Sequence, residues 1–332
     1  MDEPKSFKEI TPQDIFKDND ETISFKTYKN YLISLANLIK KEFGQENYLE
    51  KINKNIEKSM FDRNAFVDLE KIKSLLFNSW HTELNFLLPV IIGGEFMKYS
   101  IHWSPVQAYY SLYLSVRALF ESSNSDINPN HTKTLSAISE WISKRKLFLY
   151  PWSCYCSGLE KLGNLKFECF KEGISEVSML SVPSEGSFES CFAKFLKTTR
   201  ERQFKQKRES TKDIKTQEGK RKKKWAVKDK KKVEKRIHNT TLFDCMYRLR
   251  IKSNYEDVDA YILSEMSDFD ILEFYESLEI ILNSTLYILE TLILRYLGKD
   301  EMDSMIEEFT KKIHKQEFFE KGIFLRKDFL KK

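Results

Sequence analysis

Glycine and proline are scarce in this chain of 332 residues, which contains 10 glycines and 7 prolines. Both residues interrupt helices, glycine because of its backbone freedom and proline because it lacks an amide hydrogen. Residues of high helical propensity dominate the rest of the sequence, and no stretch alternates between apolar and polar residues long enough to predict a strand. The sequence therefore predicts an all-α protein without internal repeats.

Cysteines and long apolar runs are also few. The five cysteines are odd in number and form no CxxC pair, and the N-terminal letters MDEPKSFKEI show no secretory signal. Reduced thiols and a cytoplasmic location are the expectation. The apolar run 84–92 is broken by Pro89, and the run 280–297 contains Glu290 and Arg295. Neither run is expected to cross a membrane.

Motifs that mark common enzyme classes are missing. The sequence has no glycine-rich phosphate loop, no GxSxG and no HExxH, which argues against kinase and hydrolase folds. The five histidines lack metal-ligand spacing, so neither a metal nor a cofactor is expected. His81 and His102 adjoin tryptophans and are expected to pack against neighbouring side chains. Arg117 is expected to pair with a carboxylate of the bundle.

Charge is distributed unevenly along the chain. The net charge is +5, yet residues 194–236 contain 20 Lys and Arg against 6 Asp and Glu, a local net charge of +14. The remaining residues then hold 35 basic and 44 acidic side chains, a net charge of −9. One basic segment on a mildly acidic body indicates an anionic partner. Because this segment has few apolar residues, part of it is expected to be mobile or to fold only on contact.

Apolar spacing predicts helices over 25–43, 48–61, 66–88, 104–122, 239–254, 268–297 and 301–315. The helix 104–122 is apolar on nearly every side, and its small stripe of Ser111 and Ser115 would let a second helix approach closely. Residues 145–192 show no sustained period and are interpreted as short helices and loops. The apolar and basic tail after the last helix is expected to pack back on the bundle.

We divide the chain into three regions. Residues 1–98 form an N-terminal helical region, and residues 299–332 form a C-terminal amphipathic helix and tail. Residues 99–298 form the central bundle, interrupted by a large insertion at about 146–237 that includes the basic segment 194–236.

Three pieces of the sequence resemble one family in order and type. They are the tyrosine-rich stretch PVQAYYSLYLSVRALF from Pro105, the letters NHTK from Asn130, and LRIKSNYED from Leu249. Together they resemble the HEPN family of helical bundles, over roughly residues 100–145 and 238–298. The resemblance implies a HEPN-like bundle that binds nucleotides or RNA, encoded beside minimal nucleotidyltransferases or in toxin–antitoxin and anti-phage systems.

Active HEPN members are metal-independent ribonucleases with an Arg-x4–6-His motif, usually completed by dimerisation. Here Arg250 is followed by Ile, Lys, Ser, Asn254, Tyr255, Glu and Asp257, without a histidine, and Arg236 and His238 are too closely spaced for the motif. The resemblance therefore leaves two alternatives open. One is a ribonuclease or RNA-binding protein, and the other is a catalytically degenerate subunit that binds a partner protein, such as a nucleotidyltransferase or a nuclease.

Arg250, Asn254, Tyr255 and Asp257 are the candidate binding residues at the end of one helix. A guanidinium suits a phosphate, and an amide or a phenol suits a base edge or sugar. An ordinary helix end held by an Arg–Asp pair is the alternative. His131, at the start of another helix, is the candidate proton carrier beside Arg250, because imidazole titrates near neutrality. A cap or loop role is its alternative.

The stretch KRKKKWAVKDKKKVEKR (220–236) adds a second set of candidates. Lysine-rich stretches bind phosphate backbones without reading sequence, and an indole can stack on an exposed base. Its nominated nucleic-acid contacts are Lys222, Lys223, Lys224, Trp225 and Arg236. A solvated linker, or a patch that contacts the acidic body or an acidic partner, is the alternative.

Overall fold

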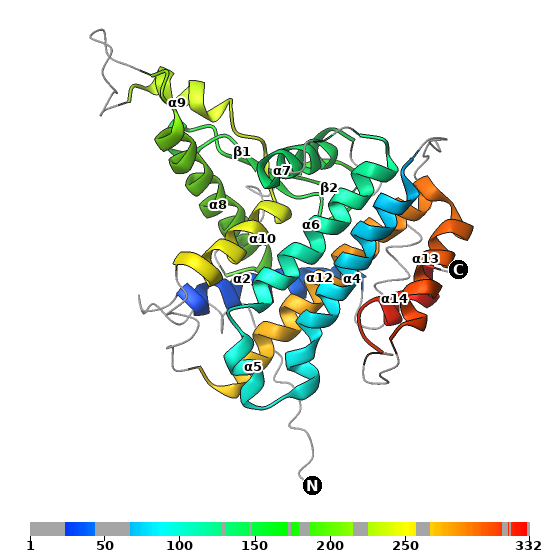
Figure 1. Cartoon of the computed structure of the whole chain (residues 1–332). Coiled ribbons are helices and arrows are strands. Elements are labelled where there is room, and N and C mark those ends of the chain that lie inside the picture. Colours follow the sequence, from blue (N-terminus) through cyan, green and yellow to red (C-terminus); the bar gives the residue numbers. More distant parts are fainter. Residues whose placement is uncertain are drawn as a thin grey trace.

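The computed structural model describes residues 24–43, 67–125, 127, 130–145, 148–171, 174–178, 186–214, 225–256, 266–313, 318 and 320–330. Most of these residues are helical, which confirms the predicted fold class (Figure 1). The predicted helices that begin near residues 25, 66, 104, 239, 268 and 301 are all present. The predicted helix 48–61 lies outside the described residues.

The longest helix, α12 (Asp268–Leu297), runs through the middle of the bundle (Figure 1). A capping box fixes its first turn, because Ser267 Oγ accepts from Asp270 N and Asp270 Oδ2 accepts from Ser267 N, both at 3.1 Å. The helix ends at Gly298, whose φ of 93° suits a residue without Cβ. Among the described helices only α12 is long and apolar enough to cross a membrane, and 83% of its apolar window is buried inside the protein, as in a core helix.

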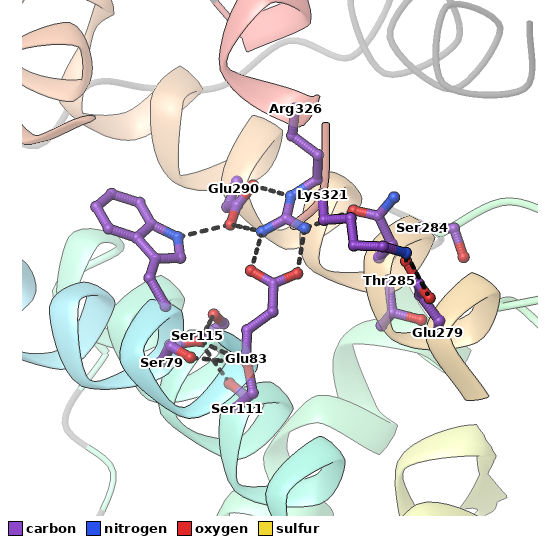
Figure 2. A network of polar contacts seen from close by, with 12 residues as sticks. Ser79, Glu83, Ser111, Ser115, Glu279, Ser284, Thr285, Glu290, Lys321 and Arg326 are labelled. Atoms are coloured by element: carbon purple, nitrogen blue, oxygen red, sulfur yellow. Dashed lines mark hydrogen bonds and ion pairs between the residues drawn. The ribbon is translucent and has the colours of Figure 1, made fainter. Parts of the chain in front are cut away.

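Helices α4 (Leu69–Ile92) and α6 (Ser104–Ser122) lie side by side, joined by the short α5 (Glu95–Ser100). Ser79 Oγ of α4 donates to the Ser111 carbonyl at 2.8 Å and lies 2.8 Å from Ser115 Oγ (Figure 2). Ser111 Oγ donates back to the Ser79 carbonyl at 3.0 Å. Such bonds require a short distance between the two backbones, which small side chains permit. The close approach predicted for the small stripe is confirmed.

One hydrophobic core joins the three predicted regions. It includes Leu32 of α2 (Ser24–Phe43), Leu76 of α4, Leu119 of α6, Leu289 of α12 and Ile306 of α13 (Lys299–Lys311). Burying one such side chain stabilises the fold by about 1.5–3 kcal/mol. The regions are therefore held together by shared burial.

The C-terminal helix α14 (Ile323–Leu330) brings one charge into this core. Arg326 is fully buried and donates to both oxygens of Glu83 at 2.5 and 2.8 Å and to both oxygens of Glu290 at 2.8 Å (Figure 2). It also donates to Asn283 Oδ1 at 2.5 Å, and Trp80 Nε1 donates to Glu290 at 2.8 Å. The tail thus packs back on the bundle, as predicted, and it does so through a buried ion network.

A second group of helices packs beside this bundle. Helix α8 (Phe188–Ser210) lies against α2, and α10 (Leu242–Ile251) contacts α6, α7 (His131–Glu140) and α8. Helix α7 continues into a π-type turn, η1 (Trp141–Arg145). The chain segments that resemble the HEPN motifs therefore meet at α10.

The interpretation of 145–192 as helices and loops alone is wrong. Strands β1 (Tyr155–Ser157), β2 (Lys166–Lys171), β3 (Ile174–Ser178) and β4 (Thr240–Thr241) form an antiparallel sheet in the order β3-β2-β1-β4, with a 3-10 turn, η2 (Glu160–Leu162), between β1 and β2. The strands are two to six residues long, and all three residues of β1 are at least partly shielded from solvent. So short and covered a strand shows no apolar–polar alternation in the sequence.

The basic segment is folded wherever the structure describes it. Residues 194–210 belong to α8, and α9 (Val227–Glu234) packs against that helix. Phe195, Leu196 and Arg200 of α8 are buried, whereas its later lysines are exposed. Helix α8 packs in spite of its charge, because Phe195, Leu196 and Arg200 lie on one buried face and most of its other charges lie on the exposed face. Mobility of part of the segment stays a prediction for residues 215–224, which lie outside the described residues.

Candidate nucleic-acid interface

Tyrosines from two helices and from the turn after one of them surround Arg250 and His131. We define the tyrosine cluster as Tyr109, Tyr110, Tyr113, His131, Tyr247, Arg250 and Tyr255. Helix α6 supplies the first three, the start of α7 supplies His131, and α10 with the following turn η4 (Lys252–Glu256) supplies the others. Residues separated by more than a hundred positions in the sequence thus form one site.

Arg250 lies among four aromatic rings. Its guanidinium carbon is 5.0 Å from the Tyr110 ring centre, 5.7 Å from Tyr247, and 5.8 Å from both Tyr109 and Tyr255. Nη2 also donates to the Tyr110 hydroxyl at 2.9 Å. Cation–π contacts of this kind stabilise a guanidinium that has shed most of its water. Arg250 is buried, whereas Tyr255 beside it is exposed.

His131 lies beside the guanidinium at the start of α7. Its Nδ1 is 2.7 Å from the Tyr109 hydroxyl, and its ring is 4.4 Å from the Tyr113 ring. Burial, and next the positive charge of Arg250, lower the pKa of His131, while burial raises the pKa of Tyr109. A phenol that keeps its proton can donate to Nδ1, which leaves the imidazole proton on Nε2. The site therefore favours a neutral histidine next to a cation.

The remaining motif residues divide into two groups. Asn254 is half-buried in η4, and Tyr255 is 66% exposed and covers Arg250. Asp257, the other half of the predicted Arg–Asp pair, lies outside the described residues. Among the described side chains, Arg250 donates a hydrogen bond to Tyr110.

Basic side chains line a large hollow between α8, α9 and the end of α10. We call this hollow of about 1040 Å³ the basic groove. Seven cations line it with only two carboxylates, namely Lys161, Arg202, Lys205, Arg208, Lys230, Arg248 and Lys252 with Glu201 and Glu209. Such an excess attracts a phosphate backbone and releases its counterions.

Trp225 provides an aromatic surface in this groove. The Arg208 guanidinium carbon lies 5.6 Å from the centre of its ring, and both residues line the groove. An indole held beside cations is the arrangement on which unpaired bases stack. The structure thus places one nominated residue in the groove, whereas Lys222, Lys223 and Lys224 lie outside the described residues.

Arg236 faces a different hollow. Its two terminal nitrogens donate to Asp213 at 2.9 and 2.5 Å, and these bonds hold the pKa of Asp213 well below its usual range. It lines a smaller cavity of about 440 Å³ between α7, α8 and α10, together with Arg202, Arg248 and Tyr247. Because Arg202 and Arg248 line both hollows, and Tyr247 also contacts His131 and Arg250, the groove, the cavity and the tyrosine cluster adjoin one another.

Sequence reasoning missed several residues of this surface. Arg202, Arg248 and Lys252 contribute to the groove, and Tyr109 and Tyr110 contribute to the cluster. The double tyrosine was a visible signal, since the phenols of two consecutive residues on a buried helix need polar partners. Arg202 gave no signal, because its place depends on how α8 packs.

Other predicted contacts are present away from this surface. Arg117 lies 3.8 Å from Glu121, and the His81 ring is 4.8 Å from the Phe309 ring. All five cysteines are free and buried. In the described part of the chain no group of three or more His, Cys, Asp and Glu side chains could hold a metal ion. Compared with family models, curated proteins and solved structures, the chain gives no match.

Proposed function

We propose that this protein binds single-stranded RNA along the basic groove. The observation that carries the proposal is a groove lined by seven cations and two carboxylates in which Trp225 provides a stacking surface. The resemblance to HEPN bundles supports RNA as the ligand, and the adjoining tyrosine cluster supports a path for the strand from Trp225 towards Tyr247. Electrostatic attraction would dominate affinity, and stacking would favour unpaired bases.

Binding can be measured by fluorescence anisotropy with a labelled single-stranded RNA. Replacing Lys205, Arg208 and Lys230 by alanine should weaken binding about tenfold or more, because fewer phosphates are neutralised. The same variant should reduce the salt slope by about 0.7 for each phosphate that is no longer neutralised. Trp225→Leu should weaken binding at every salt concentration, because stacking contributes about 1–3 kcal/mol per base.

A control with the same change of charge is available at the two ends of α13, which lies on the other side of the molecule from α8 and α9 (Figure 1). Alanine at Lys299, Lys311 and Lys312 should leave the affinity nearly unchanged. Equally weakened binding in the two triple variants would mean that net charge, rather than the groove, causes binding, and the proposal would fail.

RNA cleavage is a further part of this proposal. In metal-independent cleavage the ribose 2′-oxygen bonds to phosphorus while the bond to the 5′-oxygen breaks, so a proton must leave the 2′-hydroxyl and another must reach the 5′-oxygen. His131 would carry a proton, and Arg250 would stabilise the charge on the phosphate. Support comes from the shared tyrosine cluster, in which the positive charge of Arg250 acts on His131.

A nuclease assay of the purified protein tests this part. Arg250→Ala and His131→Ala should each abolish cleavage, whereas His81→Ala, which removes a histidine packed on Phe309, should keep it. Cleavage that survives both changes would show that another site is responsible.

The second candidate function is a non-enzymatic subunit that binds a partner protein. It is favoured by the missing histidine after Arg250 and by four exposed apolar side chains near α5, at Ile92, Phe96, Tyr99 and Trp103. Exposed apolar patches of this kind are typical of interaction sites. Co-purification with a partner, abolished when Phe96 and Trp103 are replaced by serine, would support it. A catalytically competent isolated homodimer would exclude it.

A further inference from the structure

A histidine and an aspartate that belong to none of the HEPN-like motifs face the cavity of about 440 Å³ described above. We call His238 and Asp244 the dyad and this space the dyad cavity; it lies between α7, α8 and α10, and both dyad residues line it. His238 Nε2 lies 2.7 Å from Asp244 Oδ1. A carboxylate in this position fixes the orientation of an imidazole.

The dyad is held rigidly by its neighbours. The Asp244 side chain is 1% exposed, and Gln203 Nε2 donates to its Oδ1 at 2.7 Å. Its Oδ2 accepts from Thr241 N at 2.9 Å and from Thr241 Oγ1 at 3.1 Å. These two bonds also cap the start of α10. Thr240 Oγ1 in turn donates to Gln203 Oε1 at 2.6 Å. The imidazole is thus presented to the cavity by a fully bonded support.

The walls of the cavity combine cations with an apolar face. Arg202, Lys207, Arg236 and Arg248 line it together with the carboxylates of Asp244 and Glu256. Arg202 is paired with Glu256 and Arg236 with Asp213, which leaves Lys207 and Arg248 as the cations without a carboxylate partner among the described residues. Nε of Arg248 is buried and has no hydrogen-bond partner among the described residues. Nη1 of the same guanidinium donates to Thr198 and Thr199 at 2.7 and 3.2 Å, which fixes the position of Arg248 beside the cavity.

The remaining wall is aromatic and aliphatic. It is formed by Tyr247, Ile251, Leu135 and Ile237. The volume falls within the range of about 300–1,000 Å³ that is typical of small-molecule sites. A planar ring could lie against Tyr247 while a phosphate met the cations on the other side.

We infer that the dyad cavity binds one nucleotide, with its phosphate near His238 and the arginines and its base against Tyr247 and Ile251. The choice of ligand rests on the proposed function, because the cavity shares Arg202 and Arg248 with the basic groove. The nucleotide can be free or can be one unit of a bound strand. In the second case the strand must be unpaired there, since a base stacked inside a duplex cannot enter a pocket between helices.

The test uses NMR of the histidine ring protons in the full chain, which has five histidines. The His238 signals are assigned with His238→Gln. Adenosine 5′-monophosphate, adenosine, inorganic phosphate and a short single-stranded RNA are titrated separately. The nucleotide should shift the His238 signals and saturate, and adenosine and phosphate should each bind about tenfold or more weakly, because each lacks half of the contacts.

Gln206→Glu supplies a variant that should fold normally, because Gln206 is an exposed residue at the edge of the cavity. The added carboxylate should repel the phosphate and lower the affinity about tenfold. Asn78→Asp is the matched control, since it makes the same chemical change on the exposed face of α4. Equal affinity in the two variants would overturn the inference.

The titrations with the monophosphate and with RNA distinguish a free nucleotide from one unit of a strand. Shifts of His238 with the monophosphate show a site for a free nucleotide, and shifts with RNA alone show a site for one unit of a strand. If RNA binds the groove and neither ligand moves the His238 signals, the inference is overturned while the proposed function stands. If the monophosphate binds and RNA does not, the inference stands and the proposed function fails.

Discussion

At the scale of single residues, Arg326 shows how one side chain can hold a terminus. Its guanidinium is fully buried and donates hydrogen bonds to the carboxylates of Glu83 and Glu290 and to the amide oxygen of Asn283 (Figure 2). Removing one member of a buried ion network leaves charges without partners, which costs more than the network contributes as a whole.

Arg326→Met should therefore lower the free energy of unfolding by about 3–5 kcal/mol in urea titrations followed by circular dichroism. Lys327→Met, on the neighbouring and more accessible residue, should change it by less than about 0.5 kcal/mol. Similar small decreases for the two variants would contradict the role assigned to the buried network.

His131 allows a second test at this scale. Its pKa is lowered in the folded protein by burial and by Arg250, and the ordinary value is 6.5. The unfolded chain therefore takes up the proton at a higher pH than the folded chain, and stability should fall as pH drops below about 6.5. Arg250→Ala should raise the pKa of His131 in an NMR titration, because one of its two causes is removed. An unchanged pKa would mean that Arg250 does not act on the imidazole.

The sequence predicts the position and partners of some of these side chains but not of others. Arg250 and His131 follow from separate motifs, and the structure places them in one cluster with Tyr255. Arg326 could not be predicted, because Glu83 lies 243 positions away and no local pattern links the two. The spacing of Arg236 and His238 excluded that histidine from the HEPN motif, although it contacts Asp244 only six positions later.

At the scale of elements, the contact between α4 and α6 depends on serine. Ser79, Ser111 and Ser115 are fully buried and bond across the interface. Larger side chains would push the helices apart and leave these hydroxyls without partners.

Ser115→Leu should lower the free energy of unfolding by about 1–3 kcal/mol, measured by urea titration. Ser74→Leu, which makes the same change on the exposed face of α4, is the control and should have little effect. If Ser115→Leu were neutral, the close approach of the two helices would not depend on small side chains.

Elements with a clear apolar period were predicted well, and those without one were not. Helix α12 has capping residues at its start and a glycine at its end, so its bounds follow from the sequence. The pairing of β1 with β4 was missed because both strands are short and lie far apart in the sequence, as Tyr155 and Thr241 show. Pairing of that kind is decided by tertiary contacts rather than by local pattern.

At the scale of the whole molecule, the described parts of the basic segment lie on one side of the fold. The basic segment brings α8 and α9 to one side of α10, and the bundle with α13 and α14 lies on the other (Figure 1). The net charge of the segment was visible in the sequence, whereas the groove was not, because α8, α9 and α10 form it together. The proposed function therefore depends on RNA following the groove to the tyrosine cluster.

Photo-cross-linking of a single-stranded RNA that contains 4-thiouridine, followed by mass spectrometry of the attached peptides, tests this path most directly. The proposed path predicts cross-links at Trp225 in the groove and at Tyr247 or Tyr255 in the tyrosine cluster, within the same complex. Cross-links confined to the exposed apolar residues Phe96, Tyr99 and Trp103, with none on α8 to α10, would contradict it.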